Sequence, residues 1–202
     1  MPTPASPPSQ SPLALDLSHL VGLDDAQLLR LCHENDPLKI ERDEHGGLHI
    51  MAPTGSEGSS NEFEVGRQLG NWIQSGPHGR GFSSSGGFSL PSGRMLAADA
   101  AFVSAARWGA LSKEERGGFA RIAPDFVIEI QSPSDSRPVL RAKMEQWIED
   151  GVRLAWLIDP ATRAVTIYRP GRAPEMLADP QSVAGDDDVL PGFQLDLSLV
   201  WG

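Results

Sequence analysis

Three side chains that could do chemistry fall on two predicted strands. In "MLAADAAFV" (95–103), strand alternation places Asp99 on one face between two alanines, which leaves room above its carboxylate. In "APDFVIEIQ" (123–131), the same alternation places Glu129 and Gln131 together on the face opposite the large apolar residues. If the two strands are neighbours, all three polar side chains converge on one spot of a sheet.

Two carboxylates and a few waters are a typical Mg²⁺ site, and Mn²⁺ is the usual substitute. Such an ion lowers the pKa of a bound water and stabilises charge on a phosphodiester oxygen. The residue types therefore favour a metal site held by Asp99 and Glu129. The alternative for Asp99 is an ion pair with Arg94 or Arg107, because a buried carboxylate needs a partner.

A helix is predicted after the second strand, in "DSRPVLRAKMEQWIEDG", with Ser134 or Asp135 as N-cap and Gly151 as its end. Lys143 lies at the border of its apolar stripe, from where the ammonium could reach back over the strand end. The alternative is a surface lysine whose stem covers apolar neighbours.

Further acids flank these elements. Glu62 and Glu64 are expected in the first turn of a helix, as an additional acidic ligand or as favourable charges at the helix N-terminus. Asp125 shares a face with Glu129, but on a strand the two lie roughly 13 Å apart, too far to hold one ion. We therefore interpret Asp125 as a strand-start residue.

The remaining pattern predicts a mixed α/β sheet flanked by helices, forming one domain over residues 13–202 after a disordered Pro/Ser-rich leader, residues 1–12. In chain order it predicts a short helix in "LDDAQLLRLCHEN", two strands in "PLKIERDEHGGLHIM", a loop in "APTGSEGSS", a helix in "NEFEVGRQLGNWIQ", two strands around "PSG" in residues 81–104, and two more strands in "RLAWLID" and "AVTIYRP".

Composition narrows the classes of protein. A net charge of −10 argues against a surface that coats nucleic acid, although it does not exclude a nuclease, whose metal ligands are themselves acidic. No apolar run approaches the roughly 20 residues of a membrane span. The single cysteine, Cys32, and the lack of a basic leader in the first 18 residues predict a cytoplasmic protein.

Other chemistries lack their motifs. His45 and His49 flank a Gly-Gly turn, which is not a convincing zinc spacing. The Gly/Ser-rich stretches carry neither a phosphate-loop lysine nor a dinucleotide pattern, and no G-x-S-x-G elbow is present.

Several stretches together resemble the Uma2 family, also called DUF820, of the restriction-endonuclease-like PD-(D/E)XK superfamily. They are "LAADAAFVS", "APDFVIEIQSPSD", "LRAKMEQWIEDGVRLAWLIDP", "AVTIYRPG" and "DVLPGFQLDL". The resemblance runs from about Leu38 to Trp201. It implies a restriction-endonuclease-like core and a Mg²⁺-dependent endonuclease site that acts on nucleic acid, with DNA as the expected substrate. It also implies a homodimer.

Position by position, the resemblance makes Asp99 the motif aspartate and Glu129 the glutamate of the E-x-K element. Gln131 stands where that element has its lysine, and a neutral amide supplies no positive charge to a phosphate. Lys143 matches a lysine common in the family and is the natural substitute, while Glu64, or else Glu62, matches the helix acid. Because of Gln131, a catalytically weak or inactive module that binds or regulates is the alternative function, and a structural protein with ion-paired acids is a third.

Overall fold

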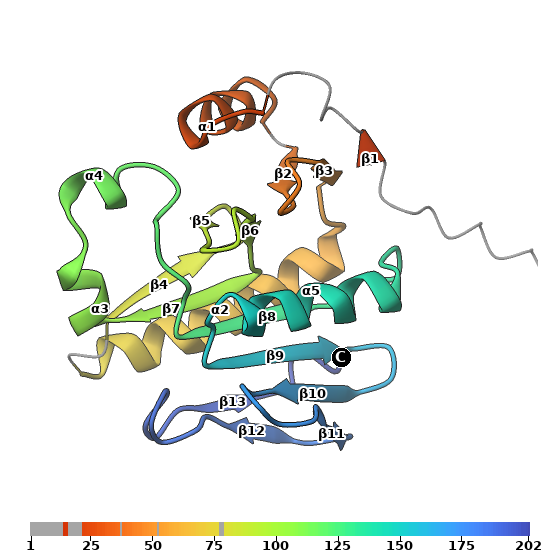
Figure 1. Cartoon of the computed structure of the whole chain (residues 1–202). Helices are drawn as coiled ribbons and strands as arrows, with labels where there is room; N and C mark the ends of the chain where they lie inside the picture. The colour runs from red at the N-terminus through yellow and green to blue at the C-terminus, as the bar shows by residue number, and fades with distance from the viewer. Residues whose placement is uncertain (1–13, 16–21, 37, 52, 77–78) are drawn as a thin grey trace, which may run out of the picture.

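The fold is a mixed α/β arrangement in which a central sheet lies between two long helices (Figure 1). The predicted leader, residues 1–12, lies outside the residues that the structure describes. The computed structural model describes residues 14–15, 22–36, 38–51, 53–76 and 79–202.

The central sheet has six strands in the order β11-β10-β9-β8-β7-β4. Strands β8 and β9 pair in parallel and the other neighbours pair antiparallel. The sheet is therefore mixed, as predicted, with β8 near its middle. The strands are β4 (Gly79–Ser83), β7 (Ala100–Ser104), β8 (Phe126–Ile130), β9 (Leu154–Asp159), β10 (Ala164–Tyr168) and β11 (Glu175–Ala178).

A second sheet has five short strands in the order β1-β3-β2-β6-β5, and two further strands form a separate ribbon. The predicted pair of strands around Gly46 and Gly47 is confirmed as the antiparallel β2–β3 hairpin. The bounds are β1 (Ala14–Leu15), β2 (Lys39–Arg42), β3 (Leu48–Met51), β5 (Gly87–Ser89), β6 (Met95–Ala97), β12 (Ser182–Ala184) and β13 (Gln194–Asp196).

The two long helices cover opposite faces of the central sheet (Figure 1). Helix α2 packs on the face that carries Phe126 and Ile128, and α5 packs on the face that carries Val127. No helix in the described part of the chain has both the length and the apolar character to cross a membrane. The helices are α1 (Asp25–Glu34), α2 (Ser56–Gln74), α3 (Ala105–Ala110), α4 (Lys113–Arg116) and α5 (Arg137–Glu149).

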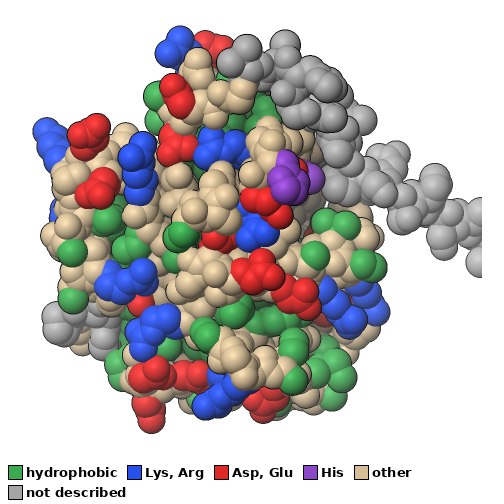
Figure 2. All heavy atoms as spheres, viewed as in Figure 1, with side chains coloured by type: hydrophobic (Ala, Val, Ile, Leu, Met, Phe, Trp, Pro, Cys, Tyr) green, Lys and Arg blue, Asp and Glu red, His purple; other side chains and the backbone are tan. Residues whose placement is uncertain are grey.

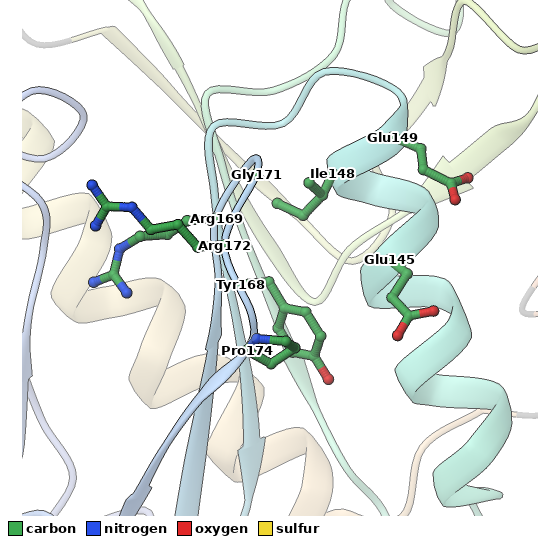
Figure 3. Close-up of a pocket in the computed structure, with 8 residues that line it drawn as sticks. All are labelled: Glu145, Ile148, Glu149, Tyr168, Arg169, Gly171, Arg172 and Pro174. Carbon is green, nitrogen blue, oxygen red and sulfur yellow. The ribbon is translucent and has the colours of Figure 1, made fainter.

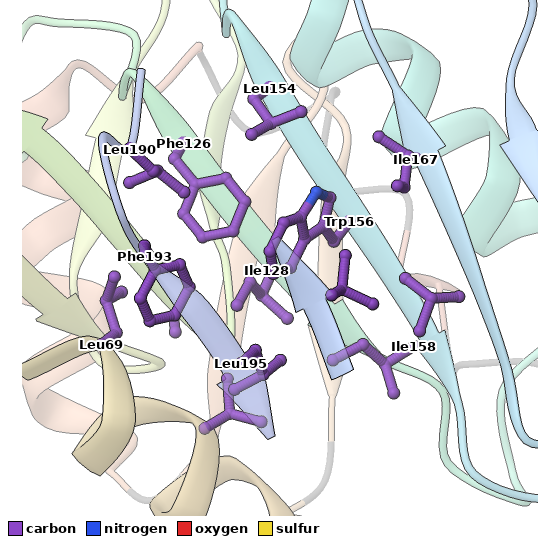
Figure 4. Packing of buried hydrophobic residues seen from close by; sticks show 14 of the residues in the cluster. Leu69, Phe126, Ile128, Leu154, Trp156, Ile158, Ile167, Leu190, Phe193 and Leu195 are labelled. Atoms are coloured by element: carbon purple, nitrogen blue, oxygen red, sulfur yellow. The ribbon is translucent and has the colours of Figure 1, made fainter. Parts of the chain in front are cut away.

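The larger core lies between the central sheet, α2 and the β12–β13 ribbon (Figure 4). Phe126 packs edge-on against Trp156, with ring centroids 4.8 Å apart, and Phe193 stacks on Trp156 at 6.0 Å. Burying such aromatic rings removes much apolar surface from water, which is the main source of stability. This core fixes the position of β8, whose other face carries Glu129.

Two helix starts differ from the sequence predictions. Helix α2 begins at Ser56, five residues before the predicted start, although its Gly/Ser-rich first turns have low helix propensity. Glu62 and Glu64 therefore lie inside the helix and not in its first turn. Helix α5 has Ser136 as its N-cap residue, not Ser134 or Asp135, and it ends at Glu149, shortly before the predicted glycine, Gly151.

The stretch before Asp99 also differs from prediction. We predicted one strand through residues 95–103, but β6 ends at Ala97 and β7 begins at Ala100. The two strands belong to different sheets. The stretch is apolar on both sides of Asp99, so the sequence pattern shows no change of partner. Asp99 thus lies where the chain passes from the five-stranded sheet to the central one.

Candidate active site

Glu129 lies on the α5 face of β8 and is almost fully buried. Its Oε1 atom accepts a hydrogen bond from Trp147 Nε1 at 2.9 Å and lies 2.8 Å from Lys143 Nζ. Trp147 and Lys143 are four residues apart on α5 and so project from the same side of the helix. The helix that follows β8 therefore returns two donors to this one carboxylate.

Asp99 lies beside β8, as the strand argument predicted. Its Oδ2 atom accepts a hydrogen bond from the backbone N–H of Ile130 at 2.8 Å, and its Oδ1 atom lies 3.7 Å from Lys39 Nζ. The alternative partners Arg94 and Arg107 were wrong. Arg94 pairs with acids of the β2–β3 turn and of the end of α5, and Arg107 pairs with Asp125.

Lys143 is not a solvated surface lysine. Its Nζ atom donates to the carbonyl oxygen of Ala97 at 2.9 Å and lies 2.8 Å from both Glu41 Oε1 and Glu129 Oε1. An ammonium group has three N–H donors. All three therefore have an oxygen acceptor at hydrogen-bonding distance.

Lys39 and Glu41 come from β2, and sequence reasoning did not find them. The two lie two residues apart and so share one face of that strand, which is the only sign of them in the sequence. A four-residue strand, however, does not indicate which residues that face contacts. Glu41 accepts a hydrogen bond from Ala97 N at 3.0 Å in addition to its contact with Lys143. The second sheet thus contributes one acidic and one cationic side chain to the site.

The helix acid that reaches the site is Glu62, and Glu64 lies elsewhere. Glu62 Oε1 is 3.8 Å from Lys39 Nζ and accepts a hydrogen bond from the Thr54 hydroxyl. Two residues along a helix turn the side chain by about 200°, so Glu64 faces away. The Glu64 carboxylate is bound by Arg67 and Gln68.

Two other predicted positions behave differently from each other. Gln131 follows β8 directly, is half-buried, and donates its backbone N–H to Ile158 O at 2.8 Å. Asp125 precedes β8 and is completely buried, where it contacts Arg107 and Arg153 and accepts the backbone N–H of Ser104. Asp125 therefore has a structural set of partners.

Burial and excess negative charge shape the ionisation of the site. Burial raises the pKa of Glu129 to about 8, with Asp99 and Glu41 adding to the rise against the opposing effect of Lys143. Burial, together with the charge of Glu62, also raises the pKa of Asp99. Although burial alone would lower it, the attraction of Glu129 and Glu41 raises the pKa of Lys143. Lys143 is thus held as a cation beside Glu129, a buried acid that resists ionisation.

Six side chains form what we call the carboxylate–lysine cluster. When all are ionised, four negative charges face two positive charges, which leaves a net charge of −2. A divalent cation would balance this charge, and buried uncompensated charge is strongly unfavourable. The members of the cluster are Lys39, Glu41, Glu62, Asp99, Glu129 and Lys143.

The donor set fits an ion such as Mg²⁺ that keeps most of its waters. In the described ranges, no three acidic, histidine or cysteine side chains are already arranged to hold a metal ion. Mg²⁺ usually binds through one or two carboxylates and retains several waters, so a complete protein cage is not needed. Asp99 and Glu129 are the two carboxylates that would hold it.

A surface pocket lies apart from the cluster, between α5 and the turn after β10 (Figure 3). Glu145 and Glu149 extend from the helix side, and Arg169 and Arg172 extend away from them on the strand side. None of its lining residues belongs to the carboxylate–lysine cluster. Chemistry, and not concavity, therefore identifies the candidate site.

The fold and site define a class: a mixed α/β protein with acids and lysines gathered at one end of a central strand. The chain belongs to the Uma2 family, because residues 25–198 match the family model, which is described as "Putative restriction endonuclease". No curated protein matches the chain.

One solved structure is similar throughout. It is described as "a putative nuclease belonging to DUF820" from Anabaena variabilis ATCC 29413, and it aligns with a TM-score of 0.72 at 20% identity. The match covers 89% of this chain and 97% of that chain. At this identity the likeness confirms the predicted nuclease-type fold.

Proposed function

We propose that this protein is a metal-dependent endonuclease that hydrolyses phosphodiester bonds, with DNA as its substrate. The observation that carries the proposal is a pair of carboxylates, the buried Glu129 and the partly buried Asp99, in a cluster with a net charge of −2 when fully ionised. The family description supports nuclease chemistry, and its words "restriction endonuclease" favour DNA over RNA.

Asp99 and Glu129 would hold Mg²⁺, or Mn²⁺ in its place. Such an ion supplies a more acidic water and stabilises negative charge that develops on the phosphate. The chain's own groups orient these ligands: the Ile130 N–H fixes Asp99, while Lys143 and Trp147 fix Glu129. The Gln131 amide, next on the same face of the strand, would orient the attacking water.

Two wider features belong to the same proposal. We expect two chains to act together, because the strands of a duplex run antiparallel and one site cuts one strand. We also propose a cytoplasmic location, which fits a chain whose single cysteine, Cys32, cannot form an internal disulfide.

The test is cleavage of plasmid and of single-stranded DNA with Mg²⁺ or Mn²⁺. Asp99→Ala and Glu129→Ala should each lower the rate by roughly 10²-fold or more, since a metal ligand supports several kcal/mol of transition-state stabilisation. Asp187→Ala, an exposed acid outside the cluster, is the matched control and should cut at the wild-type rate. Cleavage that survives both site substitutions would overturn the assignment.

A second candidate is a nuclease-fold module that binds nucleic acid without cutting it. It is favoured by the neutral Gln131 and by the three acceptors already bound to Lys143. Mn²⁺ titration by calorimetry separates the two readings, because a metal-dependent enzyme should bind the ion and should lose binding on Asp99→Asn.

A further inference from the structure

The chain has only three lysines, and two of them lie in the carboxylate–lysine cluster. They are held in different ways. Lys143 is 15% exposed, and its ammonium has three oxygen acceptors between 2.8 and 2.9 Å. A phosphate oxygen could bind this ammonium only by displacing one of those acceptors, which would leave a buried polar group without its partner.

Lys39 is held by charge and not by hydrogen bonds. Its Nζ atom lies 3.7 Å from Asp99 and 3.8 Å from Glu62, beyond hydrogen-bonding distance, and its side chain is 29% exposed. Within the described residues its ammonium donates no hydrogen bond. None of the three donors is therefore bound to a described residue, and each can meet a ligand while the two carboxylates keep the charge at the site.

The position of Lys39 matches the need of the site. It contacts Asp99, one of the two carboxylates that would hold the ion, and it extends from the β2–β3 hairpin of the second sheet. A phosphate bound by an ion at Asp99 would lie close to this ammonium. Gln131 supplies no positive charge at the strand end, so a cation from another element is required to meet the phosphate.

We infer that Lys39, and not Lys143, is the side chain that contacts the scissile phosphate, and that Lys143 is a positioning residue that orders Glu129 and Glu41. This inference rests on the proposed function. It makes the β2–β3 hairpin part of the substrate site, whereas the sequence resemblance directs attention to α5.

The experiment measures binding of a short fluorescent duplex with Ca²⁺ in place of Mg²⁺, at several salt concentrations between about 50 and 200 mM. The slope of log Kobs against log[salt] is negative, and loss of one phosphate contact reduces its magnitude by about 0.9. Lys39→Gln should show this decrease, and Lys39→Arg, which keeps the charge, should restore most of the slope. Lys143→Gln should leave the slope unchanged, as should Lys113→Gln, an exposed lysine of α4 that serves as the matched control.

Cleavage with Mg²⁺ provides the second measurement. Lys39→Gln should lower the rate about tenfold or more, with Lys39→Arg intermediate. A slope that falls for Lys143→Gln but not for Lys39→Gln would overturn the inference while leaving the nuclease proposal intact.

The remaining outcomes separate the two proposals. A wild-type protein that binds duplex but never cuts it would overturn the nuclease proposal and, with it, the role of Lys39 at a scissile phosphate, although the slope of Lys39→Gln would still show whether Lys39 contacts a backbone phosphate. A wild-type protein that neither binds nor cuts with any divalent ion would overturn both.

Discussion

At the scale of the residue, Glu129 is bound by two donors and yet lies in an environment that disfavours its ionised form. Its carboxylate accepts two short contacts from α5, yet it is fully enclosed near other acids, so burial raises its pKa from 4.5 to about 8. The folded protein without metal therefore prefers the neutral acid. A divalent ion would reverse that preference, because metal ligation requires the carboxylate.

This predicts a pH dependence of stability in the presence of a chelator. Because the pKa of Glu129 is higher in the folded than in the unfolded chain, its stabilising contribution is complete below about pH 4.5 and is lost as the pH rises through about 8. The loss is on the order of a few kcal/mol. Urea denaturation across that window should show it, and Glu129→Gln should make the pH profile flatter. An equally steep profile in Glu129→Gln would show that another group is responsible.

At the scale of elements, α5 supplies the two side chains that bind the Glu129 carboxylate near the end of β8. Lys143 and Trp147 reach the same oxygen because they lie one turn apart, and the helix ends where Gly151 takes a positive φ of 105°. Only glycine adopts that conformation without strain, and it terminates the helix before β9. A Cβ at this position would meet only ordinary contacts, so the constraint is in the backbone.

A pair of glycine substitutions tests this reading. Gly151→Ala should destabilise the fold by about 1 kcal/mol or more, because alanine is strained at positive φ. Gly66→Ala, inside α2 with open space where the Cβ would lie, should stabilise the fold by about 0.5–1 kcal/mol. Equilibrium unfolding in urea measures both. Equal effects of the two substitutions would contradict the backbone explanation.

At the scale of the whole molecule, the site lies where two sheets meet. The central sheet supplies Glu129 and the second sheet supplies Lys39 and Glu41, while Asp99 lies at the crossing between them. On the face seen in Figure 2, acidic and basic side chains are interspersed, and neither sign forms a continuous block. On this face, the proposed substrate would therefore meet a few local cations and not a generally basic surface.

The proposed dimer has a direct test. Sedimentation should give a mass of about 43 kDa, twice the 21.7 kDa of one chain, and the dimer should convert plasmid to linear DNA with little nicked intermediate. A species of single-chain mass that only nicks plasmid would contradict the dimer while leaving the hydrolytic chemistry unaffected.

The sequence alone determined the features that depend on local periodicity. Alternation in residues 126–130 assigned the two faces of β8, and helical spacing with a terminal glycine located α5 and Lys143. The family's ordered motifs identified Asp99 and Glu129 as the candidate ligands. Each of these inferences uses residues that are close along the chain, where strand and helix periods constrain which side chains share a face.

Only the tertiary structure decided which distant residues meet. It replaced Glu64 with Glu62 because the two point in opposite directions from α2, and it brought in Lys39 and Glu41 from a short strand of another sheet. It also showed that Asp99 lies at a break between sheets, which the apolar residues on both sides of it had concealed. Pairing between sheets and the burial of charge depend on the packing of the whole chain, so no local pattern contains them.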